Sequence, residues 1–388
     1  MRNFLYKCIL GISCLYLVGV LGLGYIQISR SIPDQIYITE GEEPHINTQY
    51  PLVMQGNVCR LFGILPIKTV EVTQVDRQTL YACGKIIGIY TKTQGVFVID
   101  TTEFENKAGD TVYPAKDMVV TGDYILEING EPLDNKEEMV KIVSESQGEP
   151  LELTILREQS ILSIYLTPQE GKTKDFLLGI WIKDDQAGIG TLTYFTDTGD
   201  FGTLGHGMGN GENGQILLIG EGDIYNARIL GLSKGLPGIP GEIKAVIAYG
   251  KSNHLGEVEA NTSKGVFGEV DLDDIKSHSE EYPAYEIMHK QYIQKGKAQI
   301  LSELSGELEY YDIEITYIDY LSKDNNKGIH IKITDERLLE LTGGIVQGMS
   351  GSPVIQNGRI VGAVTHVLVN DPTRGYGIFI ENMLEAAK

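Results

Sequence analysis

An uncharged apolar segment near the N-terminus, Cys8 to Ile26, most limits how this 388-residue chain can fold. It is long enough to cross a hydrocarbon core of about 30 Å as a helix. Arg2 and Lys7 precede it, so the positive-inside rule places the N-terminus in the cytoplasm and everything after the segment outside. We expect residues 1–27 to be a cytoplasmic tip and an uncleaved single-pass anchor. Cleavage as a signal peptide, or release of the catalytic part by processing, is the alternative.

Composition excludes several classes of protein. The 46 glycines and the scarcity of helix-favouring runs predict a β-rich chain with many turns. A formal net charge of −21 leaves no basic footprint for nucleic acid. The sequence has no CxxC pair and no HExxH pair, and we therefore expect no metal site and no cofactor. Cys59 and Cys83 lie in the soluble part, where a disulfide between them or two buried thiols both fit the sequence.

The rest of the chain divides into three parts. Residues 28–75 are polar and proline-containing at first, and we expect a linker and N-terminal extension with one or two strands after residue 51. Residues 76–169 form a mixed block of strands with one clear helix. Residues 170–388 form a longer block in which strands predominate and glycines recur every few residues.

The block at 76–169 carries a specific pattern. Gly122 to Leu133 (GDYILEINGEPL) reads as a strand that ends in an Asn-Gly turn. A helix with an apolar i, i+3, i+4 stripe follows, and Asp134 is its expected N-cap. Two alternating strands then close the block. This order and the GDxILxINGxxL pattern resemble a PDZ domain, an α+β module that binds a peptide as an added strand.

The resemblance to PDZ domains implies a carboxylate-binding loop at the start of the block. The segment there, GKIIGI, departs from the usual glycine-leucine-glycine-phenylalanine form. The ligand would be a peptide of a partner or the chain's own N-terminal region. The residues expected to bind it are Gly84, Lys85, Ile86, Ile87, Gly88 and Ile89.

The strongest local motif is Gly348-Met349-Ser350-Gly351-Ser352-Pro353. A nucleophilic serine needs its Oγ exposed on a tight turn, with backbone N–H groups directed at the developing oxyanion. The motif is similar to the GDSGGP turn of trypsin-like proteases, with Ser350 as the nucleophile. The N–H groups of Gly348 and Ser350 would then form the oxyanion hole. Ser352 is the rival nucleophile, but it precedes proline and replaces a glycine of that pattern.

A serine nucleophile needs a general base, and histidine titrates in the right range. His206 lies in the glycine-rich turn Thr203-Leu204-Gly205-His206-Gly207, whose small residues suit a side chain that reaches across a cleft. His366 is the competitor, because it lies at the end of the strand after Ser350. The His-before-Ser order of trypsin-like folds favours His206.

The spacing does not identify the acid that would orient the imidazole. Asp335 lies shortly before Ser350, whereas Asp197 and Asp200 lie shortly before His206. Partners in a triad meet in space and not in sequence, so the residues alone leave all three aspartates open.

Three parts of the chain together resemble the SpoIVB-type peptidases, the stage IV sporulation proteins of endospore-forming bacteria. They are the PDZ-like block, the turn around His206 and the segment Gly344 to Pro353. The tail motifs Gly362 to Val367 and Asn370-Asp371-Pro372 add to the resemblance, which covers nearly the whole chain.

The resemblance implies a catalytic triad of His206, Asp335 and Ser350. It also implies a substrate, a membrane-bound regulator in the space between the forespore and mother-cell membranes. Cleavage of that regulator would release an intramembrane protease and so activate a late sigma factor. Self-cleavage near the N-terminus is a further trait of the family.

The sequence therefore predicts a mainly β protein with an N-terminal transmembrane helix, a PDZ-like α+β domain and a trypsin-like double β-barrel. We expect a membrane-anchored serine endopeptidase that acts on a protein substrate outside the cytoplasm. A catalytically inactive PDZ scaffold that binds membrane-protein partners is the alternative. All three positions of the implied triad are filled, which argues against that alternative.

Overall fold

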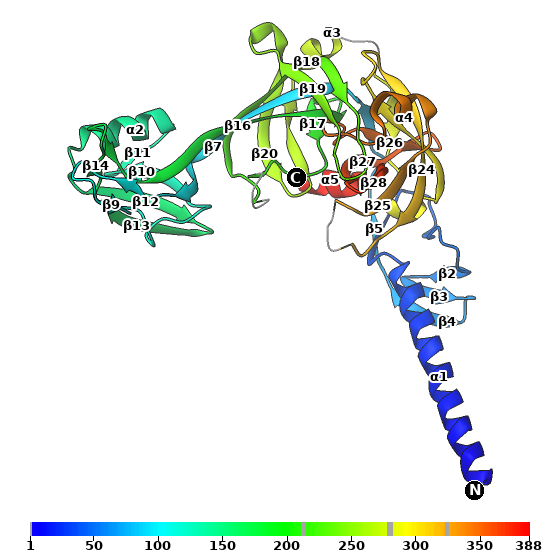
Figure 1. The fold of residues 1–388 in the computed structure, drawn as a ribbon. Coiled ribbons are helices and arrows are strands. Elements are labelled where there is room, and N and C mark those ends of the chain that lie inside the picture. Colours follow the sequence, from blue (N-terminus) through cyan, green and yellow to red (C-terminus); the bar gives the residue numbers. More distant parts are fainter. Residues whose placement is uncertain (1, 211–214, 278–281, 323–325) are drawn as a thin grey trace.

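The computed structural model describes residues 2–210, 215–277, 282–322 and 326–388 of a mainly β protein. Helix α1 (Arg2–Arg30) projects away from the body, and a PDZ-like lobe lies on the other side of the two barrels (Figure 1). From Ile9 to Arg30 the helix is long and apolar enough to cross a membrane, and none of the most apolar window is buried against protein. The expectation of one apolar N-terminal helix is confirmed.

A small folded module follows α1. Strands β1 (Gln35–Ile38) and β5 (Glu71–Gln74) pair in parallel, and an antiparallel sheet lies between them in sequence. That sheet consists of β2 (Leu52–Gln55), β3 (Val58–Leu61) and β4 (Leu65–Thr69). The strands expected after residue 51 are present, but the stretch before it is not a plain linker, because it contributes β1 and apolar side chains to a core. The buried members of that core are Ile32, Ile36, Ile46, Cys59, Ile67 and Val70.

The first barrel is built from long strands of distant sequence. The strands run in the order β7, β18, β20, β21, β17 and β16, and pairing of β7 with β16 closes the ring. Smaller elements flank it: β6 (Thr79–Ala82), β19 (Glu242–Ile247), β22 (Ala284–Glu286), η1 (Lys251–Asn253), η2 (Lys290–Tyr292) and α3 (Leu272–Ser277). The ring strands are β7 (Ile86–Thr101), β16 (Ile180–Phe195), β17 (Asp200–Thr203), β18 (Ile219–Ser233), β20 (His254–Thr262) and β21 (Gly265–Val270).

The second barrel is a closed ring in the order β23, β24, β25, β28, β27 and β26. Helix α4 (Glu336–Thr342) follows β25, and helix α5 (Ile380–Ala386) follows β28. The strands are β23 (Gly296–Ser302), β24 (Glu309–Ile318), β25 (Ile329–Ile333), β26 (Pro353–Gln356), β27 (Arg359–Leu368) and β28 (Asp371–Phe379). The two rings together form the expected double β-barrel, which confirms the predicted fold class.

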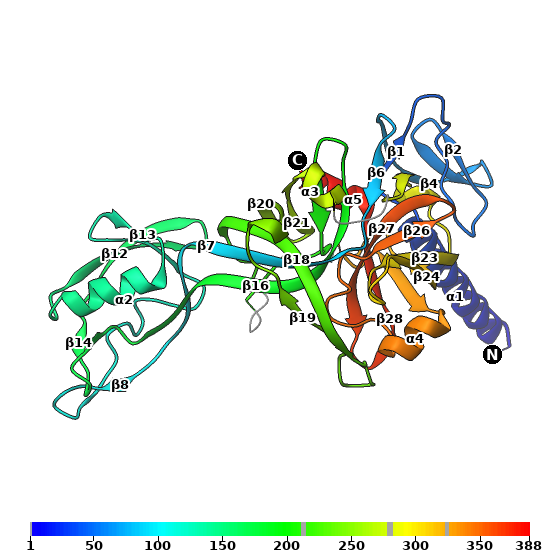
Figure 2. The ribbon, with the colours of Figure 1, turned by 90° about the horizontal axis from the view of Figure 1, so that it is seen from above.

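The PDZ-like lobe is an insertion in the first barrel. Strands β7 and β16 leave the barrel side by side, continue into the lobe and pair along most of their length (Figure 2). Within the lobe, β7 also pairs with β10, and β10 with β12. The other elements of the lobe are β8 (Phe104–Glu105), β9 (Thr111–Val112), β10 (Tyr124–Ile128), β11 (Glu131–Pro132), α2 (Lys136–Glu145), β12 (Leu151–Arg157), β13 (Ser160–Leu166), β14 (Gln169–Glu170) and β15 (Phe176–Leu177).

The boundaries of the lobe differ from those expected from the sequence, which placed the whole of residues 76–169 in the PDZ-like block and began the peptidase part at residue 170. The first half of β7 belongs to the barrel, since it pairs with both β16 and β18 there. The lobe itself matches the expected order of strand, helix and two strands. The N-cap of α2 is Asn135 and not Asp134, because the Asn135 side chain accepts the N–H of Glu138.

Cys59 and Cys83 are both free thiols in the structure. Cys59 belongs to the core of the N-terminal module, and Cys83 to the core of the first barrel. Of the two options that the sequence left open, the structure has the two buried thiols. Burial raises the pKa of Cys83 to about 12, so this thiol stays protonated at neutral pH.

Candidate active site

Ser350 lies in a glycine-rich turn between α4 and β26, where the second barrel meets the first. Helix α4 ends at Gly343, whose left-handed φ of 74° reverses the chain. Gly348 and Gly351 flank the serine with φ values of 99° and 98°, which a side chain would strain. The hydroxyl of Ser350 donates a 2.8 Å hydrogen bond to the carbonyl oxygen of Thr365 on β27.

Thr191 of β16 holds this turn from the first barrel. Its N–H donates to the carbonyl of Ser350 at 2.9 Å, and its hydroxyl donates to the carbonyl of Gly348 at 2.8 Å. Thr191 is fully buried. The nucleophile turn is therefore fixed to a strand of the opposite barrel at both of the residues expected to form the oxyanion hole.

The backbone N–H groups of Gly348 and Ser350 are available to a ligand. Within the described part of the chain, neither N–H donates a hydrogen bond, whereas the neighbouring N–H groups of Met349 and Gly351 are bonded to Val346 and Val364. Two free donors beside a serine hydroxyl are what an oxyanion hole requires.

His206 follows β17 in a strained turn beside Ser350. Leu204 and Gly205 both have left-handed φ, at 65° and 68°. A Cβ on Gly205 would lie 2.7 Å from the Thr365 side chain, so the turn packs directly on β27. A Cβ on Gly351 would lie 2.7 Å from the Leu204 nitrogen. The two turns that carry His206 and Ser350 are thus in contact.

The His206 ring is held in a defined tautomer. Its Nδ1 lies 3.0 Å from the carbonyl oxygen of Gly207. Because a carbonyl can only accept, Nδ1 carries the proton and Nε2 keeps its lone pair, which is the form a general base needs. Burial lowers the pKa of His206 below the ordinary 6.5, and the Gly207 carbonyl offsets part of this effect.

His366, the competing histidine, lies in the same site. The centroids of its ring and the His206 ring are 5.3 Å apart. His366 directly follows Thr365, the residue that accepts the Ser350 hydroxyl bond. The structure therefore brings Ser350, His206 and His366 together.

Asp335 is not joined to His206, in contrast to the implied triad. It is the N-cap of α4 and accepts the N–H groups of Arg337 and Leu338. It also accepts the N–H of Asp312 and the guanidinium of Arg337. Burial acts to raise the pKa of Asp335, but the hydrogen bonds from Arg337 and the backbone outweigh it and hold the pKa below its usual range.

The other acid candidates are also occupied or remote. Asp200 accepts the hydroxyls of Thr196 and Thr198 in the turn between β16 and β17. Asp197 is exposed in the same turn. Across the residues described here, the only hydrogen-bond partner of the His206 ring is the Gly207 carbonyl. Ser352, the rival nucleophile, is fully buried, and its hydroxyl has no partner among those residues.

The segment Gly84–Ile89 is not a peptide-binding loop. Its strand portion begins β7, which is paired on one edge with β16 and on the other with β18. A strand with both edges paired cannot add a peptide. Its Ile86, Ile87 and Ile89 side chains are buried in the barrel cores.

The lobe has a free strand edge elsewhere, which the sequence reasoning missed. Residues 180–183 of β16 pair with β7 on one side, Asp184 lies at a register shift, and no other described strand pairs with residues 180–184. Helix α2 lies beside this stretch, since Lys136 bonds to Asp184 through its N–H at 2.9 Å and its Nζ at 2.7 Å. The sequence feature that could have located this edge is Leu178-Gly179-Ile180, an apolar-glycine-apolar loop in which Gly179 has a φ of 69°.

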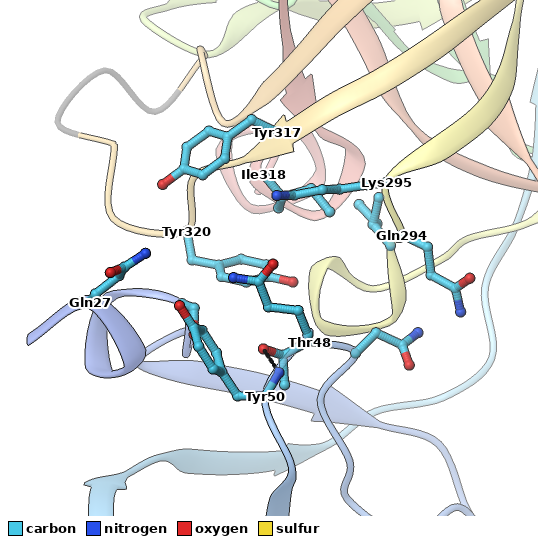
Figure 3. Close-up of a pocket in the computed structure, with 12 residues that line it drawn as sticks. Gln27, Thr48, Tyr50, Gln294, Lys295, Tyr317, Ile318 and Tyr320 are labelled. Atoms are coloured by element: carbon cyan, nitrogen blue, oxygen red, sulfur yellow. Dashed lines mark hydrogen bonds between the residues drawn. The ribbon is translucent and has the colours of Figure 1, made fainter. Parts of the chain in front are cut away.

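A cavity of about 390 Å³ lies elsewhere, between the end of α1 and the second barrel (Figure 3). It is lined by polar and aromatic side chains that include Gln27, Tyr50, Lys295, Tyr317 and Tyr320, and by none of the candidate catalytic residues. Where side chains are described, the structure has no group of three or more His, Cys, Asp or Glu residues that could hold a metal ion.

The double barrel, with Ser350 beside two free N–H groups and next to His206, defines the architecture of a trypsin-like serine peptidase with a PDZ-like insertion. Residues 174–384, more than half of the chain, match the SpoIVB peptidase S55 family. The chain belongs to this family and is a serine peptidase.

Three solved structures show how far the likeness to known folds extends. The PDZ domain of an SdrC-like protein from Listeria monocytogenes is 19% identical, covers 23% of this chain and 87% of its own, and has a TM-score of 0.20. The HtrA-type protease AlgW with a decapeptide is 10% identical and covers 79% of this chain, with a TM-score of 0.32. This chain spans 64% of the AlgW chain, less than two thirds of its length.

The Rv3671c protease of M. tuberculosis, in an inactive form, is 13% identical, with 51% of this chain and 84% of its own covered and a TM-score of 0.28. No curated protein sequence matches the chain significantly.

Proposed function

We propose that the protein is a membrane-anchored endopeptidase in which Ser350 is the nucleophile and His206 the general base. The observation that carries the proposal is the pair of free N–H groups, on Gly348 and Ser350, in a turn that Thr191 clamps from the other barrel. Such donors are preorganised to bind the oxyanion of a tetrahedral intermediate.

The reaction would proceed by acyl transfer. The Ser350 hydroxyl turns from the Thr365 carbonyl to His206 Nε2, gives up its proton and bonds to the scissile carbonyl carbon. His206 then passes the proton to the leaving amine, and water hydrolyses the acyl-enzyme. The Gly207 carbonyl holds the His206 tautomer in the role that a carboxylate has in a conventional triad. Catalytic hydrogen bonds often form only when substrate is bound, which fits the resting position of the Ser350 hydroxyl.

Asp335 has a positioning role in this proposal. It caps α4, the helix that leads into the Ser350 turn, and it anchors that helix to β24 through Asp312. Loss of its carboxylate would move the turn without removing any group that touches substrate.

The PDZ-like lobe would bind a peptide along the free edge of residues 180–184, between β16 and α2. Backbone pairing would supply affinity, and the loop Leu178-Gly179-Ile180 would receive the end of the peptide. Because Thr191 lies on the same strand as this edge, an occupied groove can influence the Ser350 turn through β16.

The setting follows from the anchor and the family. The apolar helix with Arg2 and Lys7 before it supports a single-pass membrane protein whose catalytic part lies outside the cytoplasm. Membership of the SpoIVB family supports a membrane-anchored protein substrate in sporulation signalling, activation of a late sigma factor and self-cleavage near the N-terminus.

The test compares the full chain in detergent micelles with Ser350→Ala and with Ser352→Ala as the matched control. Cleavage of fluorescent casein and self-cleavage are followed by gel and mass spectrometry. Ser352→Ala removes only a buried hydroxyl without a partner among the described residues, so it should fold and cleave like wild type. Activity that persists in Ser350→Ala would refute the proposed nucleophile.

A further inference from the structure

The sheet of β2, β3 and β4 is fixed to the C-terminal turns of α1, at the end of its apolar stretch. The hydroxyl of Tyr25, in the last turns of the apolar helix, donates a 2.7 Å hydrogen bond to the carbonyl of Ile67 on β4. Lys68 Nζ donates a 2.6 Å bond to the carbonyl of Ile32, just after α1. In Figure 1, β4 is the strand of this sheet that lies nearest to the N-terminal part of α1.

The end of this sheet that holds the turn between β3 and β4 exposes large apolar side chains. Phe62 and Ile64 form the turn between β3 and β4 and are 70% and 80% exposed. Leu65 on β4 and Val53 on β2 are 52% and 46% exposed. We name these four residues, Val53, Phe62, Ile64 and Leu65, the apolar tip. Their neighbours on the other face, such as Ile67 and Cys59, are buried in the core of the module, so the tip is a second apolar surface.

The turn itself is costly in water. Phe62 has a φ of 53° and Gly63 a φ of 70°, a pair of left-handed residues that usually calls for Asn-Gly. A bulky aromatic residue is disfavoured at positive φ, and Phe62 is largely exposed, so little packing within the chain offsets the strain. Backbone strain of this kind clusters at sites that contact a ligand or partner.

The charge around the apolar tip differs from that of the rest of the protein. Residues 44–70 contain Arg60 and Lys68 but no Asp or Glu, in a chain whose net charge is −21. Lys68 is largely buried and paired with the Asp34 carboxylate at 2.7 Å, whereas Arg60, which donates to the carbonyl of Ile64 in the turn, is the cation beside the tip. An apolar tip with this one cation beside it matches the interface of an anionic lipid bilayer, where basic groups meet headgroups and apolar groups meet acyl chains. A protein partner would not require the absence of acidic residues.

We propose that the apolar tip inserts into the interface of the same bilayer that α1 spans, so that the body is held by two membrane contacts. The proposal rests on the membrane anchor in the proposed function. The module already bonds to α1 through Tyr25 and Lys68, and a second membrane contact at the tip would also fix the height and tilt of the body at the bilayer. The active site would then meet membrane-anchored substrates at a fixed distance from the lipid surface.

The test uses tryptophan as a depth probe in the full chain. The protein has one tryptophan, Trp181, which is exposed in the PDZ-like lobe and is first replaced by phenylalanine. Ile64→Trp is then compared with Ile161→Trp, a matched control that is 61% exposed on β13 of the lobe. Both are reconstituted in vesicles of phosphatidylglycerol and phosphatidylcholine with and without bromine on the acyl chains. Exposed positions tolerate both substitutions because no internal contact is lost.

We expect brominated lipid to quench Ile64→Trp fluorescence at least twofold, with blue-shifted emission, and to leave Ile161→Trp unchanged. Equal quenching at both positions, or none at residue 64, would overturn the proposal. A blue shift at residue 64 without quenching would also overturn it, since protein and not lipid would then cover the tip. Flotation of the same vesicles separates the two claims: protein that does not float at all fails the anchor, whereas floating protein with an unquenched tip fails only this inference.

Discussion

The N–H of Thr191 on β16 donates a 2.9 Å hydrogen bond to the carbonyl of Ser350 in the opposite barrel. The same strand begins in the PDZ-like lobe, where residues 180–184 offer a free edge beside α2. One continuous strand therefore joins the expected peptide groove to the nucleophile turn. The proposed peptide groove and the nucleophile turn therefore both contact β16.

Thr191→Val should lower kcat with little change in KM. The substitution keeps the shape and the backbone bond but removes the hydroxyl that holds the Gly348 carbonyl, so the oxyanion hole loosens. We expect a loss of about 10-fold to 100-fold, below the 10²–10³ seen when an oxyanion donor itself is removed. Steady-state cleavage of fluorescent casein measures it.

Thr193→Val is the matched control for that substitution. Thr193 lies on the same strand and is equally buried, but its hydroxyl has no partner among the described residues. It should leave kcat unchanged, and Thr191→Ser should restore most of the activity. A similar loss in Thr191→Val and Thr193→Val would show that buried packing, and not the bond to Gly348, matters.

The pH dependence of kcat/KM should report His206. The base must be neutral, and burial lowers its pKa below 6.5, so activity should persist as the pH falls and the acid limb should lie below pH 6.5. His366→Gln should leave that limb in place if His206 is the titrating group. A limb above pH 6.5 would indicate that a carboxylate joins His206 in the working enzyme, contrary to the geometry described here.

Asp335→Ala should destabilise the fold and lower kcat together. Loss of the N-cap alone costs about 0.5–2 kcal/mol of unfolding free energy. The pKa of the Asp335 carboxyl is depressed in the folded state, so its charge stabilises the fold above the unfolded pKa of about 3.9 and this contribution is lost as the pH falls through the folded pKa. Denaturant unfolding at pH 7 and near pH 3 measures the loss of unfolding free energy and its dependence on pH. Steady-state cleavage of casein measures kcat.

Arg337→Ala provides the comparison for Asp335. Arg337 binds Asp335, Glu309 and the carbonyl of Tyr310. Its replacement should also lower stability and kcat, and the two losses should not add in the double variant with Asp335→Ala. Neither substitution should move the acid limb of kcat/KM. A shifted limb in Asp335→Ala alone would restore Asp335 to the role of triad acid.

Peptide binding should protect the β16 edge from hydrogen exchange. Decapeptides that end in Val, Leu, Ile or Phe with a free carboxylate are added to the full chain in micelles. We expect slower exchange in the proteolytic fragments of the protein that cover residues 180–184 and α2. The reason is that the bound decapeptide, as an added strand, bonds to the free backbone groups. Protection at Gly84–Ile89 in place of these residues would contradict the assignment.

Much of the site was predictable because its signals are local. Glycines on both sides of Ser350 and of His206 are required by left-handed or crowded backbone, and that requirement is visible in the sequence. The helix α2 and the strands after it followed from apolar periodicity.

The remaining errors arose where pairing between distant segments decides the structure. Residues 84–89 (GKIIGI) and residues 177–180 (LLGI) have similar apolar-glycine patterns. Only pairing with β16 and β18 shows that residues 84–89 belong to the barrel. The family resemblance implied Asp335 as the triad acid, but its oxygens are taken by the N-terminus of α4 and by Arg337. Residues 28–50 looked like a linker, because the core of the N-terminal module combines side chains from that stretch with the short strands after it.

The most direct test of the account is the site of covalent labelling by a fluorophosphonate. The full chain in micelles is treated with the probe, digested and mapped by mass spectrometry, beside Ser350→Ala and Ser352→Ala. We predict a single adduct on Ser350, present in wild type and Ser352→Ala and absent from Ser350→Ala. Two results would contradict the central claim. One is a folded wild type that the probe does not label, even with casein or peptides added. The other is an adduct on another serine.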